Sequence, residues 1–177
     1  MFAGPRTGSM IMHISRRSLI ASAAALAGGA ATSAFAQTAP FVVYDDELKN
    51  GWQNWSWGTT LEMSVPAGTV KPIKVEGGAW SALDLHHEAF STAPYTKLTF
   101  YINGGLEGGQ NLAVKVKAAG GTAIESNYVI QPKLKTWTPV VVALKDIGAD
   151  NKTIEDIFFQ GQADVYKAYY ITKIQFE

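Results

Sequence analysis

The residues best suited to bind a ligand lie in one short stretch, residues 44–58. Trp52, Trp55 and Trp57, three of the five tryptophans, fall within six residues, among amides, glycines and carboxylates. A hydrophobic core rarely needs its largest side chains so close together beside so many polar groups. A sugar-binding surface does, because indole faces stack on the apolar C–H face of a pyranose while amides and carboxylates bind its hydroxyls. Closing the end of a core is the alternative use of each ring, and we expect at least one of the three to bind ligand.

Further polar and aromatic side chains extend this candidate site. Residues 103–110 connect two segments of alternating hydrophobicity, and four glycines bring the backbone close to whatever lies above it. Asn103 and Gln110 at the ends present amides suited to vicinal hydroxyls, although the same segment also suits a flexible turn. The remaining candidates are Asn54 for hydrogen bonds and Trp80 and Tyr101 for stacking.

The elements that must position these residues are short strands. Period-two alternation is clear in residues 97–102, 111–117 and 170–176. Other β-rich segments are residues 41–44, 60–65, 70–75, 79–85, 128–131, 137–144 and 157–160. Single helical turns are compatible with residues 145–147 and 154–156. The spacing predicts an all-β chain, a single antiparallel β-sandwich of jelly-roll type with about nine to ten strands.

The first 36 residues have the features of an export signal. S-R-R-S-L-I at 15–20 is a twin-arginine signature, an uncharged Ala/Gly-rich stretch follows, and A-F-A at 34–36 is a cleavage site. This stretch is too weakly apolar for a spanning helix of about 20 residues. We therefore expect residues 1–36 to be a twin-arginine signal peptide and residues 37–177 to be the domain. The domain would be periplasmic or extracellular, with no membrane insertion after cleavage.

Charge and cysteine content exclude several classes of function. All three arginines lie in residues 1–36, so residues 37–177 carry twelve lysines and 15 acidic residues, a net charge of −3. Without arginine forks or a basic stripe, nucleic acid and anionic membranes are poor partners. The chain has no cysteine, which removes disulfides, thiolate metal sites and thiol nucleophiles.

Together these segments resemble a known family. Residues 44–57, the strand 98–102 with the Asn-Gly-Gly that follows it, and Gly109-Gln110 look like a secreted carbohydrate-binding module with a β-jelly roll, a galactose-binding-like sandwich. Trp137 with its valine-rich strand and the closing residues 169–171 extend the resemblance over nearly all of residues 37–177. The resemblance implies binding of a polysaccharide or oligosaccharide without catalysis, and a glycan-degrading enzyme as a partner.

Modules of this type often hold a structural calcium ion between acidic residues near the first strand and an aspartate in the last strand. Here the corresponding place in the last strand, residues 170–173, reads Y-I-T-K and has no carboxylate. Asp45 and Asp46 remain as candidate oxygen ligands, or as residues that cap a turn. We therefore expect no cofactor, with a calcium ion at Asp45 and Asp46 as the alternative.

The other polar residues support catalysis less well. His86 and His87 are adjacent on a strand, so their side chains point to opposite faces and cannot chelate one ion. Glycoside hydrolysis needs two carboxyl groups about 5–9.5 Å apart, and the sequence does not pair them. Two alternatives to a binding module remain: a structural or adhesive protein of the envelope or matrix, and a small glycan-acting enzyme. A carboxyl pair facing the tryptophans would favour the enzyme; an exposed apolar patch or edge strand would favour the adhesive protein.

Overall fold

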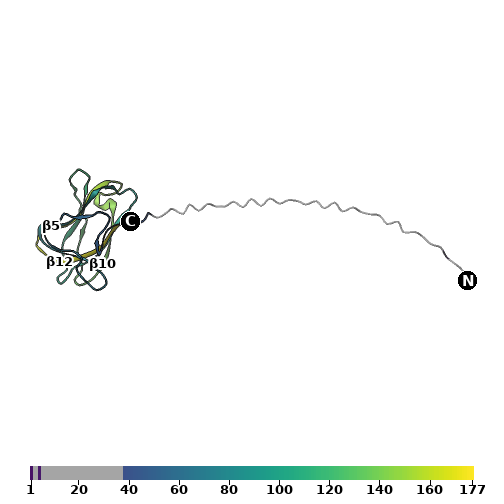
Figure 1. The fold of residues 1–177 in the computed structure, drawn as a ribbon, viewed down its shortest axis with the longest axis horizontal. Coiled ribbons are helices and arrows are strands. Elements are labelled where there is room, and N and C mark those ends of the chain that lie inside the picture. Colours follow the sequence, from purple (N-terminus) through teal and green to yellow (C-terminus); the bar gives the residue numbers. More distant parts are fainter. Residues whose placement is uncertain (2–3, 5–37) are drawn as a thin grey trace. The chain divides into compact units, whose positions relative to one another are not determined.

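The computed structural model describes residues 1, 4 and 38–177. Apart from Met1 and Gly4, the predicted signal peptide lies outside the described residues. Residues 38–177 form a β-rich fold (Figure 1). Its elements are β1 (Phe41–Asp45), β2 (Glu47–Leu48), β3 (Gln53–Asn54), β4 (Trp57–Glu62), β5 (Ile73–Ser91), β6 (Lys97–Asn103), β7 (Leu112–Ala118), β8 (Ala123–Ile124), β9 (Val129–Ile130), β10 (Thr138–Ala143), the 3-10 turn η1 (Leu144–Ile147), β11 (Thr153–Gly161) and β12 (Tyr166–Phe176).

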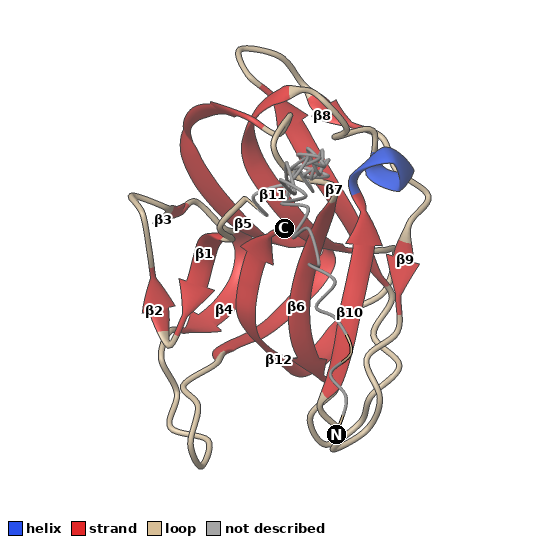
Figure 2. Ribbon diagram, turned by 90° about the vertical axis from the view of Figure 1, so that its right-hand side faces the viewer, coloured by secondary structure: helices blue, strands red, loops and turns tan. Residues whose placement is uncertain are grey.

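The strands form two layers because the long strand β5 takes part in both (Figure 2). The strand order is β10-β6-β12-β5-β11-β7-β8, and neighbouring strands are antiparallel. The first part of β5, up to Gly77, pairs with β12, whereas the part from Ala82 onward pairs with β11. Between them lies Trp80, whose φ of 61° is in the left-handed region. The strand passes from one sheet to the other at this point.

These strands confirm the predicted all-β sandwich, with two local corrections. Residues 70–75 and 79–85, expected as two strands, belong largely to the single strand β5. Residues 154–156, expected as a helical turn, lie inside β11, whereas the turn expected at 145–147 is η1. Twelve strands are present in residues 38–177, four of them only two residues long: β2, β3, β8 and β9. Within the described part of the chain, no helix is long and apolar enough to cross a membrane.

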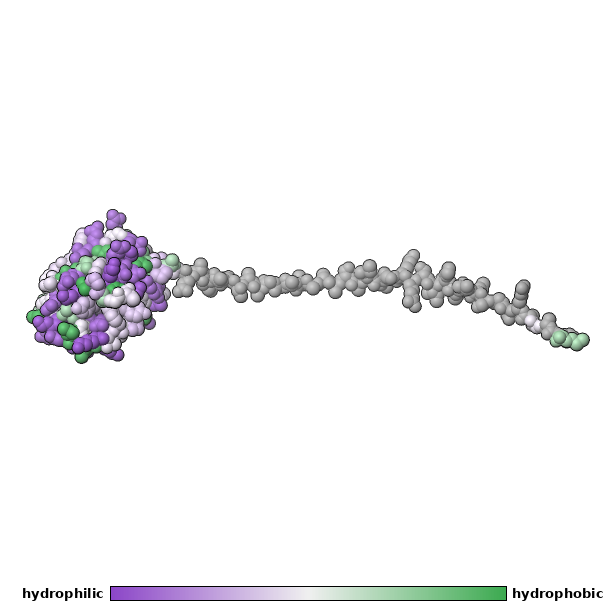
Figure 3. Space-filling model, turned by 60° about the horizontal axis from the view of Figure 1, so that its bottom comes forward, coloured by the Kyte–Doolittle hydropathy of each residue, from purple (hydrophilic) through white to green (hydrophobic). Residues whose placement is uncertain are grey.

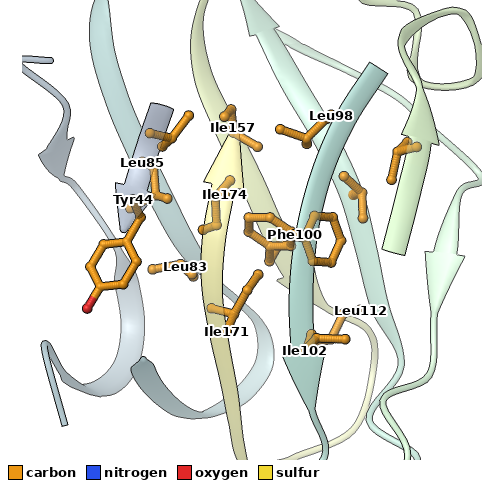
Figure 4. Close-up of a cluster of buried hydrophobic side chains, with 14 of the residues drawn as sticks. Tyr44, Leu83, Leu85, Leu98, Phe100, Ile102, Leu112, Ile157, Ile171 and Ile174 are labelled. Carbon is orange, nitrogen blue, oxygen red and sulfur yellow. The ribbon is translucent and has the colours of Figure 1, made fainter. Parts of the chain in front are cut away.

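The core forms between the two layers because alternate residues of each strand point inward (Figure 4). Leu83 and Leu85 of β5 and Phe159 of β11 are fully buried there, and Phe159 meets Phe100 of β6 edge to face at 5.0 Å. Fully burying a side chain of this size contributes about 1.5–3 kcal/mol. The intervening residues point outward, so the sandwich has two outer faces. We call them the β5–β11–β7 face and the β10–β6–β12 face.

Candidate functional site

The predicted tryptophan cluster divides between the core and the surface. Trp52 is only 4% exposed, and its ring packs against those of Phe41, Phe90 and Phe176 with centroids 5.7–6.3 Å away. Trp52 therefore takes the alternative role of packing in the core, because other rings cover it. Trp55, Trp57 and Trp80 instead expose 53%, 42% and 57% of their surface. We call these three residues the tryptophan platform.

The ring of Trp55 packs on the β5–β11–β7 face. Its ring stacks on the ring of His86 in β5, with centroids 3.5 Å apart and planes 13° apart. The ring nitrogen Nε1 donates to Oε1 of Gln53 at 3.1 Å, and the backbone N–H donates to the carbonyl oxygen of Asp84 at 3.0 Å. Since His86 covers one face of the indole and Gln53 occupies its polar edge, the opposite indole face is the part left for a ligand.

Trp57 and Trp80 are joined through the backbone of Trp80. The carbonyl oxygen of Trp80 accepts from Nε1 of Trp57 at 3.1 Å and from Nε2 of Gln160 at 3.2 Å. The N–H of Trp80 donates to the carbonyl oxygen of Gln162 at 3.0 Å. These three bonds hold a bulky residue at positive φ, a conformation that costs about 1–2 kcal/mol. Residues strained in this way concentrate at active sites and ligand clamps.

A row of charged residues crosses the same face. Asp156 of β11 is opposite His86 of β5 on one side and Lys117 of β7 on the other. Its Oδ1 lies 2.6 Å from Nδ1 of His86, and its Oδ2 lies 3.1 Å from Nζ of Lys117. The lysine also pairs with Glu155 at 2.5 Å, and these two carboxylates, Glu155 first, raise the pKa of Lys117. The row His86–Asp156–Lys117 therefore continues from the stacked ring of Trp55.

Asp84 completes this polar group. Asp84 is 6% exposed and Asp156 only 1%. Burial first, and the charge of Asp156 second, raise the pKa of Asp84 to about 7. Near neutral pH, Asp84 is therefore partly protonated in the folded protein.

Asn54 lies beside the platform and shapes it. Its Oδ1 accepts from the backbone N–H of Ser56 at 3.1 Å and from the Ser56 hydroxyl at 2.6 Å. The Ser56 hydroxyl oxygen in turn accepts from the N–H of Asp84 at 3.0 Å. These contacts fix the turn between Trp55 and Trp57. The amide nitrogen of Asn54 makes no hydrogen bond within residues 38–177, and it remains available to a ligand.

The other predicted ligand-binding residues lie away from the platform. Gln110 is 5% exposed, and its Nε2 donates to the carbonyl oxygens of Gly104 at 2.9 Å and Lys167 at 3.2 Å. The amide nitrogen of Gln110 therefore ties the connection 103–110 to β12 and is not left free for a ligand. Tyr101 and Asn103 are outward-facing residues of β6, so they belong to the β10–β6–β12 face on the opposite side of the sandwich.

The candidate calcium ligands have protein partners. The Asp45 carboxylate lies 3.2 Å from Nζ of Lys173, and Oδ1 of Asp46 accepts from the N–H of Lys71 at 2.8 Å. Within the described residues, no three His, Asp or Glu side chains are grouped as a metal site.

Sequence reasoning missed much of the polar half of the site. Asp156, Lys117 and Gln160 were not expected there, and His86 was considered only as a metal ligand. The sequence did contain one indication of these residues: Asp84 and His86 alternate with Leu85 in an apolar strand, so both point outward. The sheet order β5-β11-β7 decides which strands are neighbours, and therefore which polar residues meet.

Solved structures with a similar fold are family 29 carbohydrate-binding modules. One such module superimposes with a TM-score of 0.61 at 17% identity, over 78% of this chain and 87% of that chain. A variant of the module CBM29-2 complexed with cellulohexaose gives 0.61 at 18% identity, over 78% and 89% of the two chains. Another variant, complexed with mannohexaose, gives 0.57 at 16% identity, over 78% and 90%.

In sequence, the chain is 29% identical over 150 residues to an endoglucanase of Dictyostelium discoideum, covering 75% of this chain and 20% of that protein. The chain thus spans about a fifth of the length of the curated relative it matches. No protein-family model matches the chain. The predicted resemblance is confirmed for the fold: residues 38–177 have the β-jelly-roll fold of family 29 carbohydrate-binding modules.

Proposed function

We propose that residues 38–177 form a non-catalytic module that binds a polysaccharide on the tryptophan platform. The observation that carries this proposal is that Trp55, Trp57 and Trp80 are each about half exposed, and that the rings of Trp55 and Trp57 pack on His86 and Phe158 of neighbouring strands. The ring nitrogens of Trp55 and Trp57 are held by the protein, which leaves apolar ring faces for pyranose rings. In the row His86–Asp156–Lys117, the Lys117 side chain is 28% exposed and supplies a charged donor for sugar hydroxyls.

The proposed ligand is a glucan or a mannan. Structures with the same fold were complexed with cellulohexaose and with mannohexaose, and the curated relative is an endoglucanase. Export through the twin-arginine route, to the periplasm or beyond, would bring the module to such polymers. A glycan-degrading enzyme acting on the same polymer is the proposed partner.

The carboxyl pair beside the platform fits a binding role better than catalysis. Asp84 is 6% exposed and Asp156 only 1%, whereas the two carboxyl groups of a glycosidase flank the bond that is cleaved and must reach the substrate. Asp156 is also engaged by both His86 and Lys117. The pair is therefore placed to orient the polar row beside the sugar.

The distribution of hydrophobic residues on the surface bears on the alternative that this is a structural or adhesive protein. On the face shown in Figure 3, hydrophobic residues form small groups among hydrophilic ones. A protein-binding surface typically presents a larger continuous apolar patch. The half-exposed indoles beside charged residues favour a glycan.

The test is calorimetric titration of the purified protein with cellulohexaose and mannohexaose. We expect Trp55→Ala and Trp57→Ala each to weaken binding by about tenfold or more, since stacking contributes ~0.5–1.5 kcal/mol beyond the buried area. Leu134→Ala, at an exposed residue away from the platform, is the matched control and should bind as the unchanged protein does. Equal affinity of all four proteins, or no binding of either oligosaccharide, cellulose or mannan, would refute the proposal.

A further inference from the structure

A second aromatic surface lies on the β10–β6–β12 face. Tyr101 and Trp137 are 44% and 37% exposed and line a groove of about 540 Å³ together with Thr172. A second hollow of about 270 Å³ shares Trp137 and runs on past Asn103 and Tyr170. We call the two hollows together the Trp137 groove. Tyr101 and Asn103 were expected at the ligand site from the sequence, and the tryptophan platform does not use them.

The sheet register places the lining residues side by side. Tyr101 of β6 is opposite Thr172 of β12, and Asn103 is opposite Tyr170. Trp137 immediately precedes β10, which is the neighbour of β6 on its other side (Figure 2). Neighbouring strands lie about 4.8 Å apart, so Trp137 and Tyr170 are separated by roughly two strand spacings across β6. That distance is suited to stacking under two sugar rings of one chain with a third ring between them.

A hairpin forms one wall of the groove. Residues 67–70 line it, and Ala67 and Val70 pair as an isolated antiparallel bridge. The base of this hairpin is anchored by Tyr44, whose hydroxyl donates to the carbonyl oxygen of Lys71 at 2.7 Å and accepts from the N–H of Ser64 at 3.1 Å. The wall is therefore fixed to the core, and the groove is preformed.

Polar groups without partners lie between the aromatic rings. Oδ1 of Asn103 accepts from the N–H of Gly105 at 2.9 Å, whereas its amide nitrogen makes no hydrogen bond within residues 38–177. Thr172 is 2% exposed, and its hydroxyl also lacks a partner among the described residues. Lys135 lines the groove and forms no ion pair in that part of the chain. Rings alternating with free donors suit the C–H faces and hydroxyls of a sugar.

We propose that the Trp137 groove is a second binding site, for a chain of neutral sugars, on the opposite outer face from the tryptophan platform. A peptide that adds a strand needs a free sheet edge, whereas this groove crosses β6, which is paired on both sides by β10 and β12. An apolar helix needs a continuous apolar groove, which Asn103, Thr172 and Lys135 interrupt. With sites on both faces, one domain bridges two glycan segments.

Nuclear magnetic resonance of the indole N–H groups tests this site separately from the platform. The five tryptophan signals report on five places, and that of buried Trp52 reports on folding. We expect cellulohexaose or mannohexaose to shift the Trp137 signal both in the unchanged protein and in Trp57→Ala. Calorimetry should give two ligands per protein, and one ligand in Trp137→Ala. The resonance of Trp52 should be unchanged in Trp137→Ala, which shows that this variant is folded.

The outcomes separate the two proposals. A Trp137 signal that moves while those of Trp55 and Trp57 do not would support the groove and refute the platform. A Trp137 signal unmoved by either oligosaccharide, or a stoichiometry unchanged in Trp137→Ala, would overturn the groove and leave the platform standing. Trp137→Phe keeps an aromatic face, and retention of the second site by this variant is the expected control result.

Discussion

The buried rings around Trp52, which we call the corner, and the tryptophan platform include residues close together in the sequence, but they differ in exposure to solvent. At the corner, Trp52 packs among Phe41, Phe90 and Phe176, and its ring nitrogen has no hydrogen-bond partner within the described residues. On the platform, the nitrogens of Trp55 and Trp57 are bonded and the rings are exposed. The difference teaches that a tryptophan cluster in a sandwich is not one functional unit: tryptophans close in sequence can be exposed on a sheet face or buried among aromatic rings.

The largest expected effect is on the corner. Trp52→Ala should lower the free energy of unfolding by about 3–5 kcal/mol, because it leaves a cavity among aromatic rings. Trp52→Phe should cost less, since a ring still fills most of the space and the unpaired N–H is gone. Urea unfolding measures both losses. If the corner and the platform are as different as we infer, folded Trp52→Phe binds oligosaccharide normally; loss of binding in this variant would contradict the comparison.

The second expected effect concerns Asp84 under the platform. Between the ordinary pKa of about 3.9 and its value of about 7 in the folded protein, the folded state binds more protons than the unfolded state. The free energy of unfolding therefore falls as the pH rises through this window, by up to roughly 4 kcal/mol. Asp84→Asn, which cannot ionise, should be more stable than the unchanged protein at pH 8 and nearly equal at pH 4.

Urea unfolding at several pH values measures this difference between the two proteins. Asp164→Asn, at an exposed loop residue, is the matched control and should show no such pH-dependent gain. A gain for Asp84→Asn that is the same at pH 4 and pH 8 would contradict the raised pKa of Asp84.

A smaller effect is expected at Trp80, where exposure and strain coincide. Glycine adopts the left-handed backbone conformation without steric strain, whereas alanine keeps the strain of a Cβ atom. Trp80→Gly should therefore be more stable than Trp80→Ala by about 1 kcal/mol. Both variants lose the same ring, and both should bind oligosaccharide equally weakly. Thermal unfolding and titration of the pair separate strain from stacking. Greater stability of Trp80→Ala would show that the backbone there is not strained.

The smallest expected effect is at His86, which supports Trp55 from the sheet side. His86→Ala removes the stacked ring and should weaken oligosaccharide binding a few-fold, less than Trp55→Ala does. His86→Phe restores a ring without the contact to Asp156, and it should recover most of the affinity. If His86→Phe binds no better than His86→Ala, the hydrogen bond between His86 and Asp156, and not the stack, is what positions Trp55.

The two local errors in the sequence prediction have physical causes. Ile154 and Ile157 are three residues apart, which is the spacing of one helical turn. Both are nevertheless buried in a strand, because the pairing of β11 shifts register between Ile154 and Asp156. A β-bulge of this kind breaks the period-two pattern locally. The join of residues 70–75 and 79–85 was missed because Gly77 and Gly78 between them are typical of a turn, whereas β5 passes through them from one sheet to the other.

The sequence by itself determined the all-β class, the alternating strands and the presence of indoles suited to sugars, because side-chain alternation and residue type are local properties. Only the tertiary structure decided that Trp52 is buried, that Tyr101 and Asn103 lie on the face opposite Trp55, and that Asp156 lies between His86 and Lys117. Those outcomes depend on which strands pair and which face is buried. Strand pairing joins residues far apart in the chain, as with His86 and Asp156, and is set by burial of the whole core.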